Sequence, residues 1–72
     1  MLKTIHSKEY KQVVERLKKS RINSGLTQSE VAQKLGKSQS YISKVEVGEQ
    51  RLDVIELKKL ARIYKKNINV FI

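Results

Sequence analysis

The sequence predicts an all-α domain, a compact bundle of four to five short helices that ends in a short extended or hydrophobic C-terminal tail. Three observations predict this class. Apolar residues recur at helical spacing in four successive segments. Each of the three glycines in the chain stands just after one of the first three segments, where a helix would end. Side chains that cap helix N-termini stand before the last three segments.

The first segment predicts a helix over about residues 8–24. Its stripe of residues at helical spacing ends on a charge and consists of Tyr10, Val13, Val14, Leu17 and Arg21. Gly25 follows the stripe, and glycine adopts the left-handed conformation of a helix C-cap without a steric penalty. We therefore expect the chain to turn at Gly25.

Three start signals agree on the beginning of a second helix. Thr27 can cap its N-terminus, and Glu30 can reach back to complete a capping box. Leu26 can pack on Val31 as a hydrophobic staple. We expect this helix to end at Gly36 and its buried face to consist of Val31, Ala32 and Leu35.

Two further helices follow the same rules. Ser38 is the expected N-cap of the third, which ends before Gly48 and buries Ile42 and Val45. The fourth begins within residues 52–57, where Asp53 and its neighbours repeat the cap, the acidic third position and the staple. Its core positions are Leu57, Leu60, Ala61 and Tyr64.

Residues 67–72 break the helical pattern, because they alternate for a few positions and then end in three apolar residues. A strand or a hydrophobic arm fits this pattern. Such a tail docks either on its own core or on a second subunit, and we favour the second. No repeat or low-complexity linker interrupts the chain, so we expect one domain over residues 1–72.

The amino-acid composition limits the classes of function that the chain can have. The chain has 16 lysine and arginine residues against seven acidic ones, a net charge of +9 and a pI of about 10.1, which suits a polyanionic partner. No cysteine, no membrane-length apolar run and no signal-peptide core is present, so we expect a cytoplasmic protein without a membrane partner. The lone His6 has no accompanying catalytic or metal-binding motif, so no enzyme, cofactor or metal site is expected.

The third predicted helix has two unlike faces. Turned away from its apolar residues are four hydrogen-bonding side chains that share one face, namely Gln39, Ser40, Ser43 and Lys44. Glutamine can pair with adenine, lysine can donate to guanine, and serine can serve either base. A solvated surface helix also shows a polar face. The position directly after a tight glycine turn favours base readout, because the second helix of such a motif enters the major groove.

The run TQSEVAQKLGKSQSYISKVEVGE resembles the phage repressor and Cro type of helix-turn-helix, the XRE family, and the similarity spans about residues 10–64. The matching positions are Thr27, Gln28, Glu30, Ala32, Gly36, Ser38, Gln39, Ile42, Ser43, Glu46 and Gly48. The resemblance implies a lambda-repressor-like fold with its helix-turn-helix unit over about residues 27–47. Val47, the pair Glu49-Gln50 and the tail depart from the family pattern.

The resemblance also implies roles for particular side chains. The base-reading set would consist of Gln39, Ser40, Ser43 and Lys44. Contacts to the DNA backbone or groove edge would come from Gln28, Ser38, Tyr41, Lys37, Arg51 and Arg16. A partly buried structural ion pair would join the first and third helices through Arg21 and Glu46.

These roles imply a sequence-specific transcriptional regulator that binds double-stranded DNA, most simply a repressor that binds a near-palindromic operator as a homodimer. Activation through polymerase contact uses the same fold. The alternative is a protein-interaction module, such as an antitoxin or a coactivator-like adaptor, whose partner is a toxin or polymerase.

Overall fold

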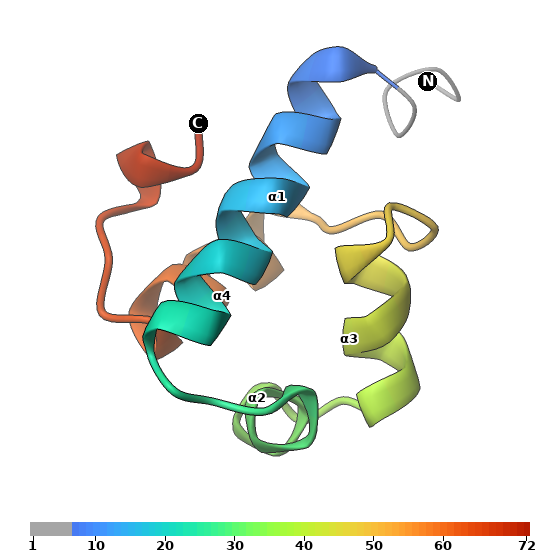
Figure 1. The fold of residues 1–72 in the computed structure, drawn as a ribbon, viewed down its shortest axis with the longest axis vertical. Coiled ribbons are helices and arrows are strands. Elements are labelled where there is room, and N and C mark those ends of the chain that lie inside the picture. Colours follow the sequence, from blue (N-terminus) through green and yellow to red (C-terminus); the bar gives the residue numbers. More distant parts are fainter. Residues whose placement is uncertain (1–6) are drawn as a thin grey trace.

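The computed structural model describes residues 7–72, which form an all-helical globule of 30 × 24 × 19 Å (Figure 1). In chain order its elements are α1 (Lys8–Asn23), α2 (Gln28–Leu35), α3 (Gln39–Glu46), α4 (Val54–Ile63) and the 3-10 turn η2 (Ile68–Val70). Figure 1 shows α3 on one side of α1 and the C-terminal segment on the other, with α2 seen end-on at the base. The predicted all-α class is confirmed.

Local capping bonds fix where the helices begin. Thr27 Oγ1 accepts from the Glu30 backbone N–H at 3.1 Å, and the Glu30 carboxylate accepts from the Thr27 N–H at 2.8 Å, which completes the predicted capping box. Ser38 caps α3 and Asp53 caps α4, both as predicted. Ser7 caps α1 in the same way, which the sequence reasoning did not anticipate.

Each of the first three helices ends close to a glycine. Gly36 is the C-cap of α2 with a φ of 78°, and its Cα faces open space, so the left-handed backbone rather than crowding calls for glycine there. The fourth helix ends differently. Lys65, just past α4, has a φ of 57° and is the only non-glycine residue with a positive φ among residues 7–72.

The core lies where the four helices meet. Every inward position predicted for the second, third and fourth helices is buried, and Val14 and Leu17 are buried on α1. Both residues of the predicted staple of α2 lie at the core, because Val31 is fully buried and Leu26 packs against the core cluster. Helical spacing alone was therefore enough to identify most of the residues that stabilise the fold.

The C-terminal tail corrects one prediction. It is not extended, because η2 coils it, and Phe71 docks on the chain's own core, where it is 0% exposed, rather than on a second subunit. Ile68 also packs partly against that core, whereas Ile72 is 70% exposed. An aromatic ring buries a large apolar area, so a position inside the monomer is more favourable than an exposed arm.

None of the helices within residues 7–72 combines the length and the apolar character needed to cross a bilayer. His6, the lone histidine of the chain, lies outside the described residues.

Candidate nucleic-acid interface

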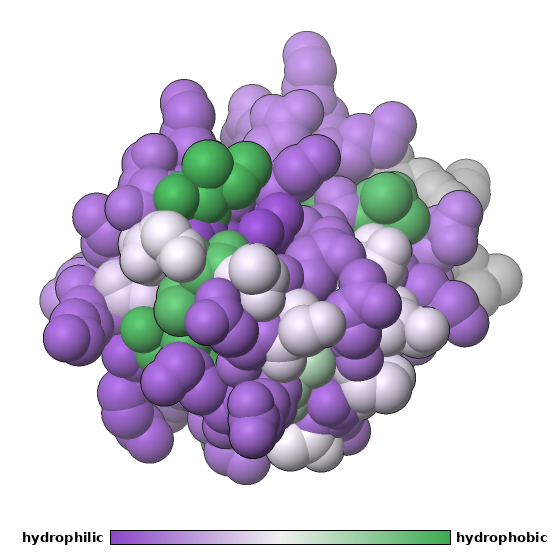
Figure 2. Space-filling view, turned by 60° about the horizontal axis from the view of Figure 1, so that its bottom comes forward, coloured by the Kyte–Doolittle hydropathy of each residue, from purple (hydrophilic) through white to green (hydrophobic). Residues whose placement is uncertain are grey.

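The outer face of α3 carries the four side chains predicted to read bases. Gln39, Ser40 and Lys44 are exposed and Ser43 is half-buried, while Ile42 and Val45 anchor the opposite face of the helix in the core. Figure 2, which brings the α2 side of the molecule forward, shows mostly hydrophilic atoms, with apolar atoms gathered mainly on the left and in one smaller group at the upper right. The buried face of α3 packs firmly in the core, and its opposite face presents hydrogen-bonding side chains to the solvent.

Gln39 is held in place by a second glutamine. Its Nε2 donates to Oε1 of Gln28 at 2.8 Å, and Nε2 of Gln28 donates to Oε1 of Glu46 at 2.9 Å. A primary amide has two N–H donors, so the bond to Gln28 leaves Gln39 with its second N–H and its oxygen. Those are the groups that a glutamine needs to pair with adenine.

Glu46 also closes an ion pair with α1. Its two carboxylate oxygens accept from Nε of Arg21 at 2.7 Å and from NH2 at 3.1 Å, and NH1 of Arg21 donates to the Leu26 carbonyl at 2.9 Å. The two side chains are only 14% and 4% exposed. The hydrogen bond that Arg21 donates to Glu46 raises the pKa of Arg21, so the guanidinium stays charged.

These contacts form one continuous series that we call the α1–α3 network: Arg21, Glu46, Gln28 and Gln39. It runs from the partly buried ion pair to the exposed start of α3. A contact to the DNA backbone was predicted for Gln28. In the structure its side-chain amide is instead hydrogen-bonded within the protein, to Glu46 and to Gln39. The backbone N–H groups at the start of α2 can still face an anion.

Lys37 and Tyr41 form a separate cluster with α4. The Tyr41 hydroxyl donates to Glu56, Lys37 Nζ lies 3.4 Å from the other Glu56 oxygen, and the same ammonium lies 5.1 Å from the centroid of the Tyr41 ring. Burial, and then the Glu56 carboxylate, raise the pKa of Tyr41, which keeps its hydroxyl protonated. The cluster links α3 to α4. Because Glu56 bonds to Tyr41 and Lys37, its side chain does not complete a capping box at the start of α4.

The loop that carries Arg51 is tied to α1 through Tyr10. The Tyr10 hydroxyl accepts from the Leu52 N–H at 3.0 Å and donates to the Gln50 carbonyl at 3.4 Å. Arg51 itself is exposed. Sequence reasoning placed Tyr10 only in the apolar stripe of α1, and no local signal points to a partner some 40 residues away.

Two of the remaining predicted contacts differ in placement. Ser38 stands at the start of α3, where its Oγ accepts from the Tyr41 N–H at 3.2 Å. Arg16 is not brought to α3, because it lines a hollow on α1 beside Phe71 and Ile72. Lys11 lines a hollow of about 220 Å³ with Glu15, Glu46, Val47 and Gly48 at the end of α3.

Within residues 7–72, no three His, Cys, Asp or Glu side chains gather so that they could hold a metal ion. The exposed face of α3 carries hydrogen-bond donors and acceptors, and the cations Lys37 and Arg51 flank it in the sequence.

Comparison with known proteins agrees with this geometry. A family model described as helix-turn-helix matches residues 17–71, which covers α2, α3, α4, η2 and the second half of α1. A search of curated proteins found no match. The chain therefore belongs to the helix-turn-helix family of the XRE type, whose members bind double-stranded DNA as regulators of transcription.

Proposed function

We propose that this protein is a sequence-specific repressor that reads its operator with α3. The observation that carries the proposal is the α1–α3 network, which fixes the Gln39 amide at the exposed start of α3. A side chain that is already held in position loses less conformational entropy on binding, so more of its hydrogen-bond energy goes to base selection. Its specificity would come from adenine at the position that Gln39 meets.

The neighbouring side chains extend the reading surface. Lys44 would donate to guanine, and Ser40 and Ser43 would bond to either base. Backbone and groove-edge contacts would come from Ser38, Lys37, Tyr41, Arg51, Arg16 and the N-terminus of α2 at Gln28. Phosphate contacts position the protein, whereas base contacts select the sequence.

The protein would act as a homodimer on a near-palindromic operator. Two copies related by a two-fold axis would place two α3 helices in successive major grooves, about 34 Å apart. The proposed activity is binding alone, in the cytoplasm, without a cofactor or a catalytic step. Repression would follow from occlusion of the promoter.

Selection from a pool of random DNA duplexes tests this function. The selection is run at about 150 mM salt, where sequence-independent phosphate binding is already weakened. We expect enrichment of a two-fold symmetric site, whose half-site spacing gives the geometry of the dimer. A folded sample that enriches no sequence would refute DNA readout and favour the protein-interaction alternative, an antitoxin or adaptor.

Variants of α3 test which side chains read the bases. Gln39→Ala and Lys44→Ala should each lower affinity for the selected site by about 1 to 3 kcal/mol and relax the preference at one base position. Gln33→Ala on α2 and Lys58→Ala on α4 remove the same chemical groups from other exposed positions and serve as matched controls. Equal losses in the control variants would show that α3 has no special role.

A further inference from the structure

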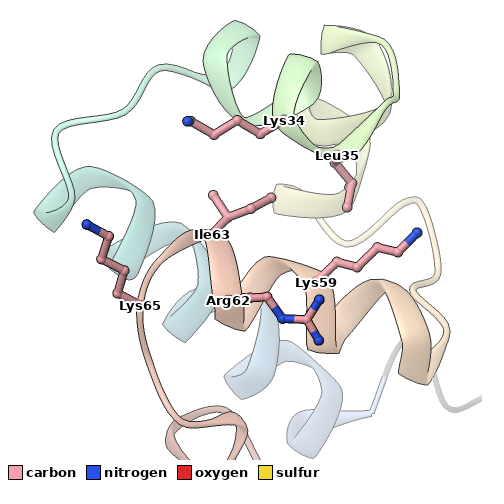
Figure 3. Close-up of a pocket in the computed structure, with 6 residues that line it drawn as sticks. All are labelled: Lys34, Leu35, Lys59, Arg62, Ile63 and Lys65. Carbon is pink, nitrogen blue, oxygen red and sulfur yellow. The ribbon is translucent and has the colours of Figure 1, made fainter.

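A basic groove lies between the end of α2 and the end of α4 (Figure 3). We call it the α2–α4 groove. Its volume is about 520 Å³, and its lining consists of Lys34, Leu35, Lys59, Arg62, Ile63 and Lys65. Four of these six residues are cationic and none is acidic, a composition that favours an anionic occupant.

The groove combines this charge with an apolar floor. Figure 3 shows Leu35 and Ile63 between α2 and α4, with the long basic side chains around them. Leu35 is 9% exposed and Ile63 packs partly against the core, so the floor is firmly supported. All four cations of the rim are exposed, namely Lys34, Lys59, Arg62 and Lys65.

The rim cations are poorly neutralised by the protein itself. The salt bridges found among residues 7–72 join Arg21 to Glu46 and Lys37 to Glu56, and neither involves the groove. Glu30 lies one turn before Lys34 on α2 and interacts with it electrostatically. The three cations contributed by α4 and the chain after it have no carboxylate within 4.0 Å in the described part of the chain.

The groove is separate from the proposed DNA-reading surface. No residue of α3 lines it. On α2, the network residue Gln28 stands in the first turn and Lys34 in the last, six residues and so about 9 Å apart along the helix axis. The two surfaces therefore leave room for two different partners.

We propose that the α2–α4 groove docks an acidic, partly apolar peptide segment of a partner protein. An apolar side chain of the segment packs on Leu35 and Ile63, while flanking carboxylates pair with Lys59 and Arg62. A guanidinium binds a carboxylate through two parallel hydrogen bonds, which gives direction as well as attraction. The phosphate backbone of a nucleic acid fits the cations but offers nothing for the apolar floor, which is why the groove favours a peptide.

A library of random 12-residue peptides, displayed and selected on the full chain, tests this assignment. We expect enriched peptides to carry a large apolar residue flanked by two or more Asp or Glu residues. Addition of a selected peptide to the ¹⁵N-labelled protein should shift the amide resonances of the groove residues and leave those of Gln39 to Lys44 unchanged. Failure to enrich acidic peptides, or shifts elsewhere on the protein, would overturn the proposal.

Charge reversal separates a specific groove from general attraction to a basic protein. The double variant Lys59→Glu/Arg62→Glu should weaken peptide binding at least tenfold, and both side chains are exposed, so the fold is retained. Lys34→Glu/Lys65→Glu repeats the test on the other two rim cations. The double variant Lys8→Glu/Lys11→Glu changes the net charge equally at the start of α1 and should bind the peptide nearly as the unaltered chain does. Equal weakening in all three variants would refute a specific site.

A nucleic acid is the competing occupant of the groove. A random-sequence DNA duplex that shifts the groove resonances more than the selected peptide does would assign the groove to phosphate binding and overturn the peptide proposal. The proposal does not depend on operator recognition. The random-duplex selection reports on α3, and the peptide selection reports on the groove, so either can fail alone.

Discussion

A guanidinium and a carboxylate lie side by side between α1 and α3, at a place where the sequence shows a charge on an apolar stripe. Arg21 and Glu46 satisfy each other in bidentate geometry, and the Leu26 carbonyl takes one of the remaining donors. Because both side chains are largely removed from water, neither partner tolerates loss of the other.

We expect Arg21→Ala and Glu46→Ala each to destabilise the protein by about 3 kcal/mol or more, because the remaining charge is left without a partner. In a domain of this size such a loss lowers the melting midpoint by roughly 12 °C or more. Thermal unfolding followed by circular dichroism measures it. An unchanged midpoint in both variants would show that the pair contributes nothing.

The double variant Arg21→Met/Glu46→Leu is the control for this pair. It replaces both charges with apolar side chains, so no buried charge is left alone. We expect it to be more stable than either alanine variant, yet to relax the preference at the base position that Gln39 meets, because Gln28 no longer has Glu46 as a partner.

A single residue stores backbone strain at the end of α4. Lys65 has a φ of 57°, a conformation that costs an L-residue about 1 to 2 kcal/mol and glycine almost nothing. We expect Lys65→Gly to stabilise the protein by about 0.5 to 1 kcal/mol after the added freedom of the unfolded chain is counted. Lys66→Gly, at a position without a positive φ, should be neutral or destabilising. Equal effects of the two variants in thermal unfolding would contradict this account.

Among the helices, α2 has the most complete set of N-terminal capping bonds. Thr27→Ala removes the bond to the Glu30 N–H and should destabilise the protein by about 1 kcal/mol. Thr27→Ser keeps the hydroxyl and should stay close to the unaltered chain. Urea unfolding of the three proteins measures the difference, and an alanine variant as stable as the serine variant would refute a role for the cap.

The same capping box gives α2 a pH-dependent part of its stability. The Thr27 backbone N–H donates to the Glu30 carboxylate and lowers the pKa of Glu30 below its ordinary value of 4.5. A carboxylate with a lowered folded-state pKa stabilises the fold above its unfolded pKa, and that contribution is lost as pH falls through the folded pKa.

We therefore expect the stability difference between the unaltered chain and Glu30→Gln to shrink as pH falls below about 4.5. Glutamine keeps a reach-back oxygen but does not titrate. Urea unfolding at a series of pH values between about 3 and 7 measures the difference. A difference that stays constant across this range would show that Glu30 does not couple to folding.

Over the whole molecule, the C-terminal segment completes the core. Phe71 is fully buried, so Phe71→Ala should cost about 3 to 5 kcal/mol, a large part of the stability of so small a domain. Ile72→Ala, at a 70% exposed side chain, is the control and should change stability little. Unfolding is measured at two protein concentrations. A loss of stability that depends on protein concentration would indicate that the tail forms part of a subunit interface.

The sequence by itself determined where α2 and α3 start and stop, where α4 starts, and which helix faces are buried. The caps at Thr27, Ser38 and Asp53 each bond to a backbone N–H three residues later, so the signal and its effect are neighbours in the chain. Helical spacing then identified the apolar stripes without knowledge of how the helices pack. The four α3 side chains could be named for the same reason, because one helix face is a local property.

Only the tertiary structure decided how those elements support one another. Tyr10 reaches a loop 40 residues away, Gln28 links Gln39 to Glu46, and Phe71 enters its own core rather than a partner's. Each of these contacts depends on the angle and distance at which separate helices pack, and no periodicity within one segment encodes them. The α2–α4 groove is decided in the same way, because its cations come from α2, from α4 and from the chain just after α4, which only the fold brings together.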